Sequence, residues 1–99
     1  METHYSWNEA KRRTNLRKHG LDFRHAGEVL QSRYRLDIEI IRNGELRTQS
    51  FSYVMTQLTV LTTIHVDRNG TTRIISFRPA SAVEVEVYLE WLETETDEP

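Results

Sequence analysis

The chain has 99 residues, of which 37% are apolar and 28% charged, and this composition is typical of one small globular domain. Cysteine is absent, which excludes disulfides and thiolate metal sites. No apolar run approaches the roughly 20 residues of a membrane span. Residues 1–7 lack the basic and apolar pattern of a secretory signal, so we expect a cytoplasmic protein without membrane contacts.

The net charge of −2 hides an uneven distribution along the chain. Residues 1–50 hold 10 Lys and Arg against 7 Asp and Glu, whereas residues 51–99 hold 3 against 8. A basic first half can offer a positive surface to nucleic acid while the whole molecule stays near neutral. The acidic end, about residues 93–99, is predicted to be a solvated, disordered tail of a single domain that spans residues 1–99.

The first predicted element is a helix that begins at Ser6. Ser6 and Glu9 have the spacing of a capping box, and Gly20 suits the left-handed residue that closes a helix. Lys18 and His19 then lie in the last turn, where the helix dipole favours positive charge. This position explains both residues without a ligand, although they could also face a substrate.

A second, short helix is predicted after Asp22, which can cap it. The apolar residues that follow have the spacing of a buried helical face: Phe23, Ala26, Gly27 and Leu30. The period then changes to two, which is typical of half-buried strands. Strands are predicted over residues 34–40, 45–54, 58–66 and 71–78, and they are joined by turns that end in Asn43-Gly44 and Asn69-Gly70.

The last predicted element is a helix over residues 83–92. Ser81 and Glu84 form a second capping box before it, although the alternation from Val83 to Val87 also fits a strand. The predicted fold class is therefore α+β, with two N-terminal helices, a four-stranded antiparallel curved sheet and a C-terminal helix. One face of this sheet could stay open to a ligand or partner.

Several common site motifs are absent from the chain. There is no HExxH zinc motif, phosphate-binding glycine loop or GxSxG nucleophile turn, and the four histidines lack helical i, i+4 spacing. We therefore expect neither a metal nor another cofactor. The remaining candidates lie on the last hairpin, where strict alternation places Arg73 and Arg78 on opposite faces unless a β-bulge intervenes. His65 shares a face with Leu61 and Thr63, and such a histidine is usually structural.

An ordered set of residues extends from about position 6 to position 90. Its first part comprises Trp7 to Lys11, Asn15, Lys18 to Gly20, Phe23 and Ala26. Its second part comprises Glu45 to Arg47, Ile64 to Arg68, Thr72 to Ser81, Glu84 and Tyr88. The set resembles the BrnT family, ribonuclease toxins of type II toxin–antitoxin systems, whose fold is similar to that of RelE.

The resemblance implies an endoribonuclease that needs no metal, blocks translation and arrests growth. It also implies a cognate BrnA-like antitoxin, through which alone the toxin would contact DNA. The catalytic candidates at matching positions are His19, His65, Arg73 and Arg78. The RNA-binding candidates are Lys11, Lys18, Arg47, Arg68 and Tyr88. In such a site a histidine transfers the proton of the 2′-hydroxyl, and cations stabilise the charge that develops on phosphate.

Two alternatives remain open at this point. The segment after Ser81 is acidic, whereas it is usually basic in the family, and this favours a non-catalytic or degenerate module that binds a protein partner. The basic first helix could instead bind DNA directly, although only Asn15 and Arg17 on it are suited to reading bases.

Overall fold

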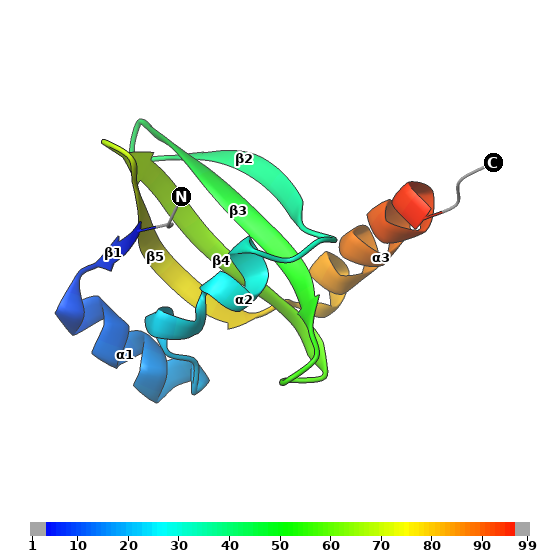
Figure 1. Ribbon diagram of the computed structural model, residues 1–99, viewed down its shortest axis with the longest axis horizontal. Helices are drawn as coiled ribbons and strands as arrows, with labels where there is room; N and C mark the ends of the chain where they lie inside the picture. The colour runs from blue at the N-terminus through cyan, green and yellow to red at the C-terminus, as the bar shows by residue number, and fades with distance from the viewer. Residues whose placement is uncertain (1–3, 97–99) are drawn as a thin grey trace.

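The computed structural model describes residues 4–96, which form helices packed on a twisted sheet (Figure 1). The elements in chain order are β1 (His4–Trp7), α1 (Glu9–His19), the 3-10 helix η1 (Phe23–His25), α2 (Gly27–Leu30), β2 (Leu36–Arg42), β3 (Glu45–Val54), β4 (Thr59–Arg68), β5 (Thr71–Pro79) and α3 (Ala82–Thr96). None of the helices in this part of the chain has the length and apolarity that crossing a bilayer requires.

The sheet has five strands in the order β1-β5-β4-β3-β2. Strands β2 to β5 form the expected antiparallel meander, but β1 pairs with β5 in parallel, with Ser6 opposite Arg73. The prediction of a four-stranded antiparallel sheet is therefore wrong, since the sheet is five-stranded and mixed. The four residues of β1 are too few to show alternation, and their partner strand lies far away in the sequence.

The first helix also begins later than predicted. Ser6 belongs to β1, and Asn8 is the N-cap, where its side chain accepts a hydrogen bond of 3.0 Å from the amide of Lys11. Asparagine is as good a cap as serine. Ser6 and Trp7 can therefore pair in the sheet while Asn8 caps α1. The far end is as predicted, because Gly20 has φ of +71° and its amide donates to the carbonyl of Leu16.

The second predicted N-terminal helix is largely a 3-10 turn. Asp22 caps it as expected, by accepting from the amide of Arg24 at 2.9 Å, but only the four residues of α2 are α-helical. Both predicted hairpin turns are present, with positive φ at Asn43-Gly44 and at Asn69-Gly70.

The helical interpretation of residues 83–92 is correct. The amide of Glu84 donates to Ser81 Oγ at 3.2 Å and the amide of Ser81 donates to Glu84 Oε1 at 2.8 Å, which is the predicted capping box. Helix α3 continues to Thr96, through the first part of the predicted tail, and residues 97–99 lie outside the described residues.

The two faces of the sheet bury different clusters of side chains. We call the face that carries Leu61, Ile74 and Phe77 the inner face, and it packs against η1 and α2. Helix α1 contributes no side chain to this cluster and is instead joined to the backbone of β5 through Asn15. The outer face carries Phe51 and Val60, and α3 covers one end of it through a cluster that includes Tyr88. Whether a residue can join a site therefore depends first on the face to which it belongs.

A β-bulge changes the alternation along β5. Ile64 lies opposite Ser76 but His65 lies opposite Ile74, so Ile75 is an extra residue on β5. The bulge keeps Ile74 and Phe77 together in the inner core. It also places Arg73 and Arg78 on the same outer face. Residues five positions apart in a regular strand point to opposite faces, but the extra residue Ile75 shifts the alternation by one, so both arginines point to the same face.

Candidate functional site

Most arginines on the outer face are already paired with carboxylates. Glu45 accepts from Arg47 Nε at 3.0 Å and from Arg68 at 2.8 Å, and these hydrogen bonds, that of Arg68 above all, lower the pKa of Glu45. Arg78 donates two hydrogen bonds to Glu84, at 2.7 and 2.9 Å. The bonds from Arg78 are the main reason why the pKa of Glu84 falls to about 2.

Arg73 differs from these arginines. Among residues 4–96, its guanidinium forms neither a hydrogen bond nor an ion pair. It lies on β5 two residues before the extra residue Ile75, and it pairs with Val66 on β4. Of the outer-face arginines predicted as catalytic or RNA-binding residues, Arg73 is therefore the one whose whole guanidinium is available to a phosphate among the described residues.

A hollow of about 360 Å³ lies between α1 and β5. We call it the α1–β5 hollow. Arg73 and Arg78 are not part of its lining, although the charge of Arg78 acts on His19, which is. The lining comprises Ala10, Lys11, Thr14, Asn15, Lys18, His19, Ile75 and Ser76. Two of these residues, Ile75 and Ser76, come from the bulge on β5. The structure thus brings together three predicted residues of α1, namely Lys11, Lys18 and His19.

Asn15 fixes the position of α1 against this strand. Its Nδ2 donates to the carbonyls of Phe77 at 2.7 Å and Leu21 at 3.0 Å, and its Oδ1 accepts from the amide of Phe77 at 3.2 Å. The side chain therefore continues the hydrogen bonding of the β5 edge beyond Ile74, where β1 ends. Because Asn15 is buried in this role, it cannot read bases, which removes one of the two groups that favoured direct DNA binding.

The basic groups of the hollow are not neutralised within the described part of the chain. Lys11 and Lys18 are exposed and form no ion pair with any described residue. The pKa of His19 is lowered, first by partial burial and then by the positive charges of Lys18 and Arg78. His19 is thus neutral near pH 7 and can accept a proton while phosphate-binding groups stand beside it.

His65 lies on the opposite face from Arg73 and Arg78. It is only 4% exposed, and its Nε2 lies 2.8 Å from Ser50 Oγ. The Ser50 hydroxyl donates to Asp37 at 2.6 Å, so the serine oxygen accepts from a protonated Nε2. The sheet itself separates His65 from the cations of the outer face, and the three cannot surround one phosphate.

Protonation of His65 should destabilise the fold. Burial is the main cause that lowers the pKa of His65 from 6.5, and the positive charge of Arg35 adds to it. The unfolded chain then binds this proton more readily than the folded chain, so stability is complete above about pH 6.5 and falls as the pH drops through that value. Urea unfolding between pH 8 and 5 should show this loss, and His65→Gln should flatten the profile. If the free energy of unfolding of His65→Gln still falls equally steeply with decreasing pH, His65 is not the cause of the loss.

Tyr88 is part of the core under α3. It is 1% exposed, its hydroxyl donates to the carbonyl of Tyr34 at 2.7 Å, and its ring centroid lies 5.8 Å from that of Trp91. The family resemblance made Tyr88 an RNA-binding candidate, but in the structure both its ring and its hydroxyl have partners within the protein. Its packing instead fixes α3 to the outer face.

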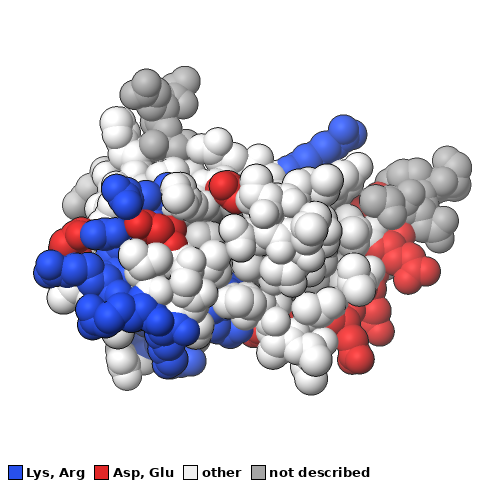
Figure 2. Space-filling view, turned by 90° about the horizontal axis from the view of Figure 1, so that it is seen from below, with Lys and Arg blue, Asp and Glu red and all other residues white. Residues whose placement is uncertain are grey.

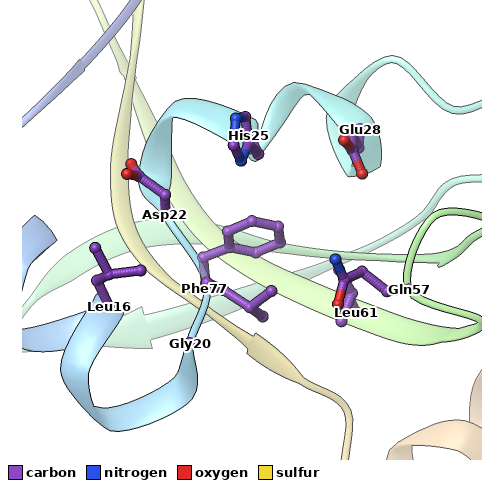
Figure 3. A pocket seen from close by; sticks show the side chains of 9 residues that line it. Leu16, Gly20, Asp22, His25, Glu28, Gln57, Leu61 and Phe77 are labelled. Atoms are coloured by element: carbon purple, nitrogen blue, oxygen red, sulfur yellow. The ribbon is translucent and has the colours of Figure 1, made fainter.

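Another hollow, of about 260 Å³, lies between the end of α1, the segment from η1 to α2, and the sheet (Figure 3). Its floor is Leu61 and Phe77, and carboxylates of Asp22 and Glu28 stand at its rim beside His25. Hydrogen bonds from Arg24 are the main cause that lowers the pKa of Asp22 to about 2. Arg12 and Arg24 already neutralise Asp22, but Glu28 adds a negative charge and, among the described residues, the lining contains no Lys or Arg. This hollow therefore suits RNA less well than the α1–β5 hollow, which Lys11 and Lys18 line.

The two ends of the molecule carry opposite charge. Lys and Arg gather over the α1 end, whereas Asp and Glu gather along α3 (Figure 2). Among the described residues, no three His, Cys, Asp or Glu side chains lie close enough together to hold a metal ion. The cations at the α1 end (Figure 2), with His19 among them, offer groups for anion binding and proton transfer.

The chain was compared with models of known protein families. Residues 7–84 match the model of the family described as ribonuclease toxin, BrnT, of type II toxin–antitoxin system. The matched segment runs from β1 to the first turn of α3 and includes every group of the α1–β5 hollow. A search of curated proteins finds no match.

Proposed function

Because this chain belongs to the BrnT family, the ribonuclease toxins of type II toxin–antitoxin systems, we propose that it cleaves RNA in the α1–β5 hollow without a metal ion. The observation that carries this proposal is the set of unpaired cations around His19, whose pKa is lowered. RNA contains its own nucleophile, the 2′-hydroxyl next to the scissile phosphate. The protein then has to position the phosphate, accept one proton and stabilise charge.

In the proposed reaction, neutral His19 accepts the proton of the 2′-hydroxyl as the oxygen attacks phosphorus. The bond from phosphorus to the 5′-oxygen breaks, which leaves a 2′,3′-cyclic phosphate, and the departing oxygen takes a proton from water in the open hollow. Lys18 and Arg73 donate hydrogen bonds to the phosphate oxygens, where negative charge grows in the transition state. Lys11 holds an adjoining stretch of backbone.

Arg78 has an indirect part in this proposal. Glu84 occupies both terminal nitrogens of its guanidinium, so Arg78 is not free to grip a phosphate in two places. Its positive charge still contributes to the lowered pKa of His19. The same pairing favours the alternative that this copy is a weak or non-catalytic member of the family, and an assay of the purified chain distinguishes the two.

The wider role is proposed on the same basis. Cleavage of RNA would block translation in the cytoplasm, a BrnA-like antitoxin would neutralise the toxin, and DNA would be contacted only through that antitoxin. Arg47 and Arg68 would steer the RNA backbone toward the hollow by long-range attraction, because Glu45 already holds their guanidinium groups.

The purified chain, freed of antitoxin, should cleave RNA in the presence of a chelator and leave cyclic phosphate ends. Arg73→Ala and Lys18→Ala should each lower the cleavage rate by about 10- to 100-fold, because each removes a charge-assisted hydrogen bond from the transition state. Gel analysis of end-labelled RNA measures the rate. Arg42→Ala, which removes an exposed arginine from the far strand β2, is the matched control and should cleave normally. RNA that stays intact between pH 6 and 8 with folded protein would refute the proposal.

A further inference from the structure

A second surface lies at the end of the molecule away from the α1–β5 hollow. Helix α3 projects beyond the sheet (Figure 1), and an apolar hollow of about 220 Å³ lies between this helix and the turn that joins β3 to β4. We call it the α3 groove, and its lining comprises Tyr53, Leu58, Thr59, Val60, Val85 and Leu89. None of these residues takes part in the proposed cleavage.

The groove exposes large apolar side chains. Leu58 is 73% exposed, Leu89 51% and Tyr53 42%. Leu58 also has φ of +54°, a strained conformation that leucine rarely adopts. The turn therefore holds a leucine out into solvent at a cost in stability, beside an apolar helix, and covering these side chains would be favourable.

Acidic residues border the groove along α3. Glu86 and Glu93 lie one helical turn on either side of Leu89, and α3 contains no basic residue. This charge decides between classes of occupant. RNA would meet like charge, and a second copy related by a two-fold axis would bring the same carboxylates to the contact, whereas a segment with both apolar and basic side chains would be complementary.

We propose that the antitoxin of this type II system docks an amphipathic segment in the α3 groove. Its apolar side chains cover Leu58 and Leu89, and its Lys or Arg side chains meet Glu86 and Glu93. The proposal depends on family membership and not on cleavage by this chain. The groove and the α1–β5 hollow share no residue. Substitutions in the groove can therefore weaken antitoxin binding without changing the RNA site.

A pair of synthetic helical peptides tests the chemistry of the groove. Both carry the same leucine stripe, but one is flanked by lysines and the other by glutamates. Fluorescence anisotropy of the labelled peptides should show that the lysine peptide binds the chain at least about tenfold more tightly. The purified cognate antitoxin should then displace it. Equal binding of the two peptides, or no displacement, would overturn the proposal.

Variants locate the binding surface. Leu58→Ser combined with Leu89→Ser should raise the Kd of the lysine peptide and of the antitoxin by about tenfold or more. Glu86→Gln combined with Glu93→Gln should weaken both several-fold and reduce the dependence on salt. The matched control is Ile41→Ser with Leu46→Ser, which removes equally exposed apolar residues from the β2–β3 hairpin and should change neither Kd more than about twofold.

Two further readouts separate the other occupants. Sedimentation that shows a dimer of the chain, lost in the Leu58→Ser and Leu89→Ser variant, would assign the groove to a second copy. Displacement of the lysine peptide by RNA would assign it to the substrate. The Leu58→Ser and Leu89→Ser variant should cleave RNA at the rate of the unmodified chain. If the unmodified chain fails to cleave RNA but binds the antitoxin through the groove, the proposed function is refuted and the proposed docking site is not.

Discussion

His19→Gln is expected to lower RNA cleavage by about 100-fold or more while leaving the fold intact. General base catalysis by a positioned histidine contributes about 10²- to 10⁴-fold, and glutamine retains hydrogen bonding but cannot accept the proton. The side chain is only half-buried, so its replacement leaves no large cavity. Initial rates on a short RNA, together with circular dichroism of the variant, measure both parts of the expectation.

The other histidines provide matched controls for this experiment. His25→Gln changes an exposed histidine outside the α1–β5 hollow and should cleave RNA at the normal rate. His65→Gln should also cleave RNA at the normal rate wherever it is folded, because His65 lies on the inner face. Cleavage by unmodified protein should rise with pH through the lowered pKa of His19, since only the neutral imidazole is a base. A folded His19→Gln variant with normal rates would transfer the role to another group.

Asn15→Ala is expected to reduce the free energy of unfolding by about 2–4 kcal/mol, the largest effect on stability that we expect from a polar side chain here. The substitution removes three hydrogen bonds between α1, the following loop and β5. It leaves the amide and carbonyl of Phe77 and the carbonyl of Leu21 without this partner in a buried place, where each unpaired group costs about 1–3 kcal/mol. Urea unfolding followed by circular dichroism measures the loss.

The neighbouring residue gives the control for Asn15. Thr14 Oγ1 donates to the carbonyl of Ala10 on the exposed side of the same helix, so Thr14→Ala should change the free energy of unfolding by less than about 0.5 kcal/mol. A loss below about 1 kcal/mol in Asn15→Ala would mean that water replaces the missing amide. The α1–β5 hollow should also open in this variant, so RNA binding should weaken along with stability.

Structure that depends on neighbouring residues was predictable from the sequence. Gly20 ends a helix, Asp22 caps the next turn, and Ser81 with Glu84 begins α3, all as expected. The two hairpins formed at the turns that their Asn-Gly pairs indicate. In each case the interacting groups lie within four residues of one another, so the pattern itself contains both partners.

Pairing between distant segments was not predictable. The sequence Ser6 to Glu9 satisfies a capping box, yet Ser6 pairs with Arg73 in the sheet because Asn8 can cap α1 instead. The bulge at Ile75 has no local signal either. It follows from the register with β4 that keeps Ile74 and Phe77 in one core, and it is the reason why Arg73 and Arg78 share a face.

The sequence was sufficient to identify the family, because the ordered residues resemble the BrnT toxins and the family model matches residues 7–84. The absence of cysteine and of nucleotide or zinc motifs narrowed the classes of site, whereas the acidic end favoured the non-catalytic alternative. Only the tertiary structure decided which candidates can act together. Glu45 and Glu84 neutralise some arginines, and the sheet separates His65 from the rest. Such pairings join groups from different elements, and charge in a folded protein depends on distance in space rather than on distance along the chain.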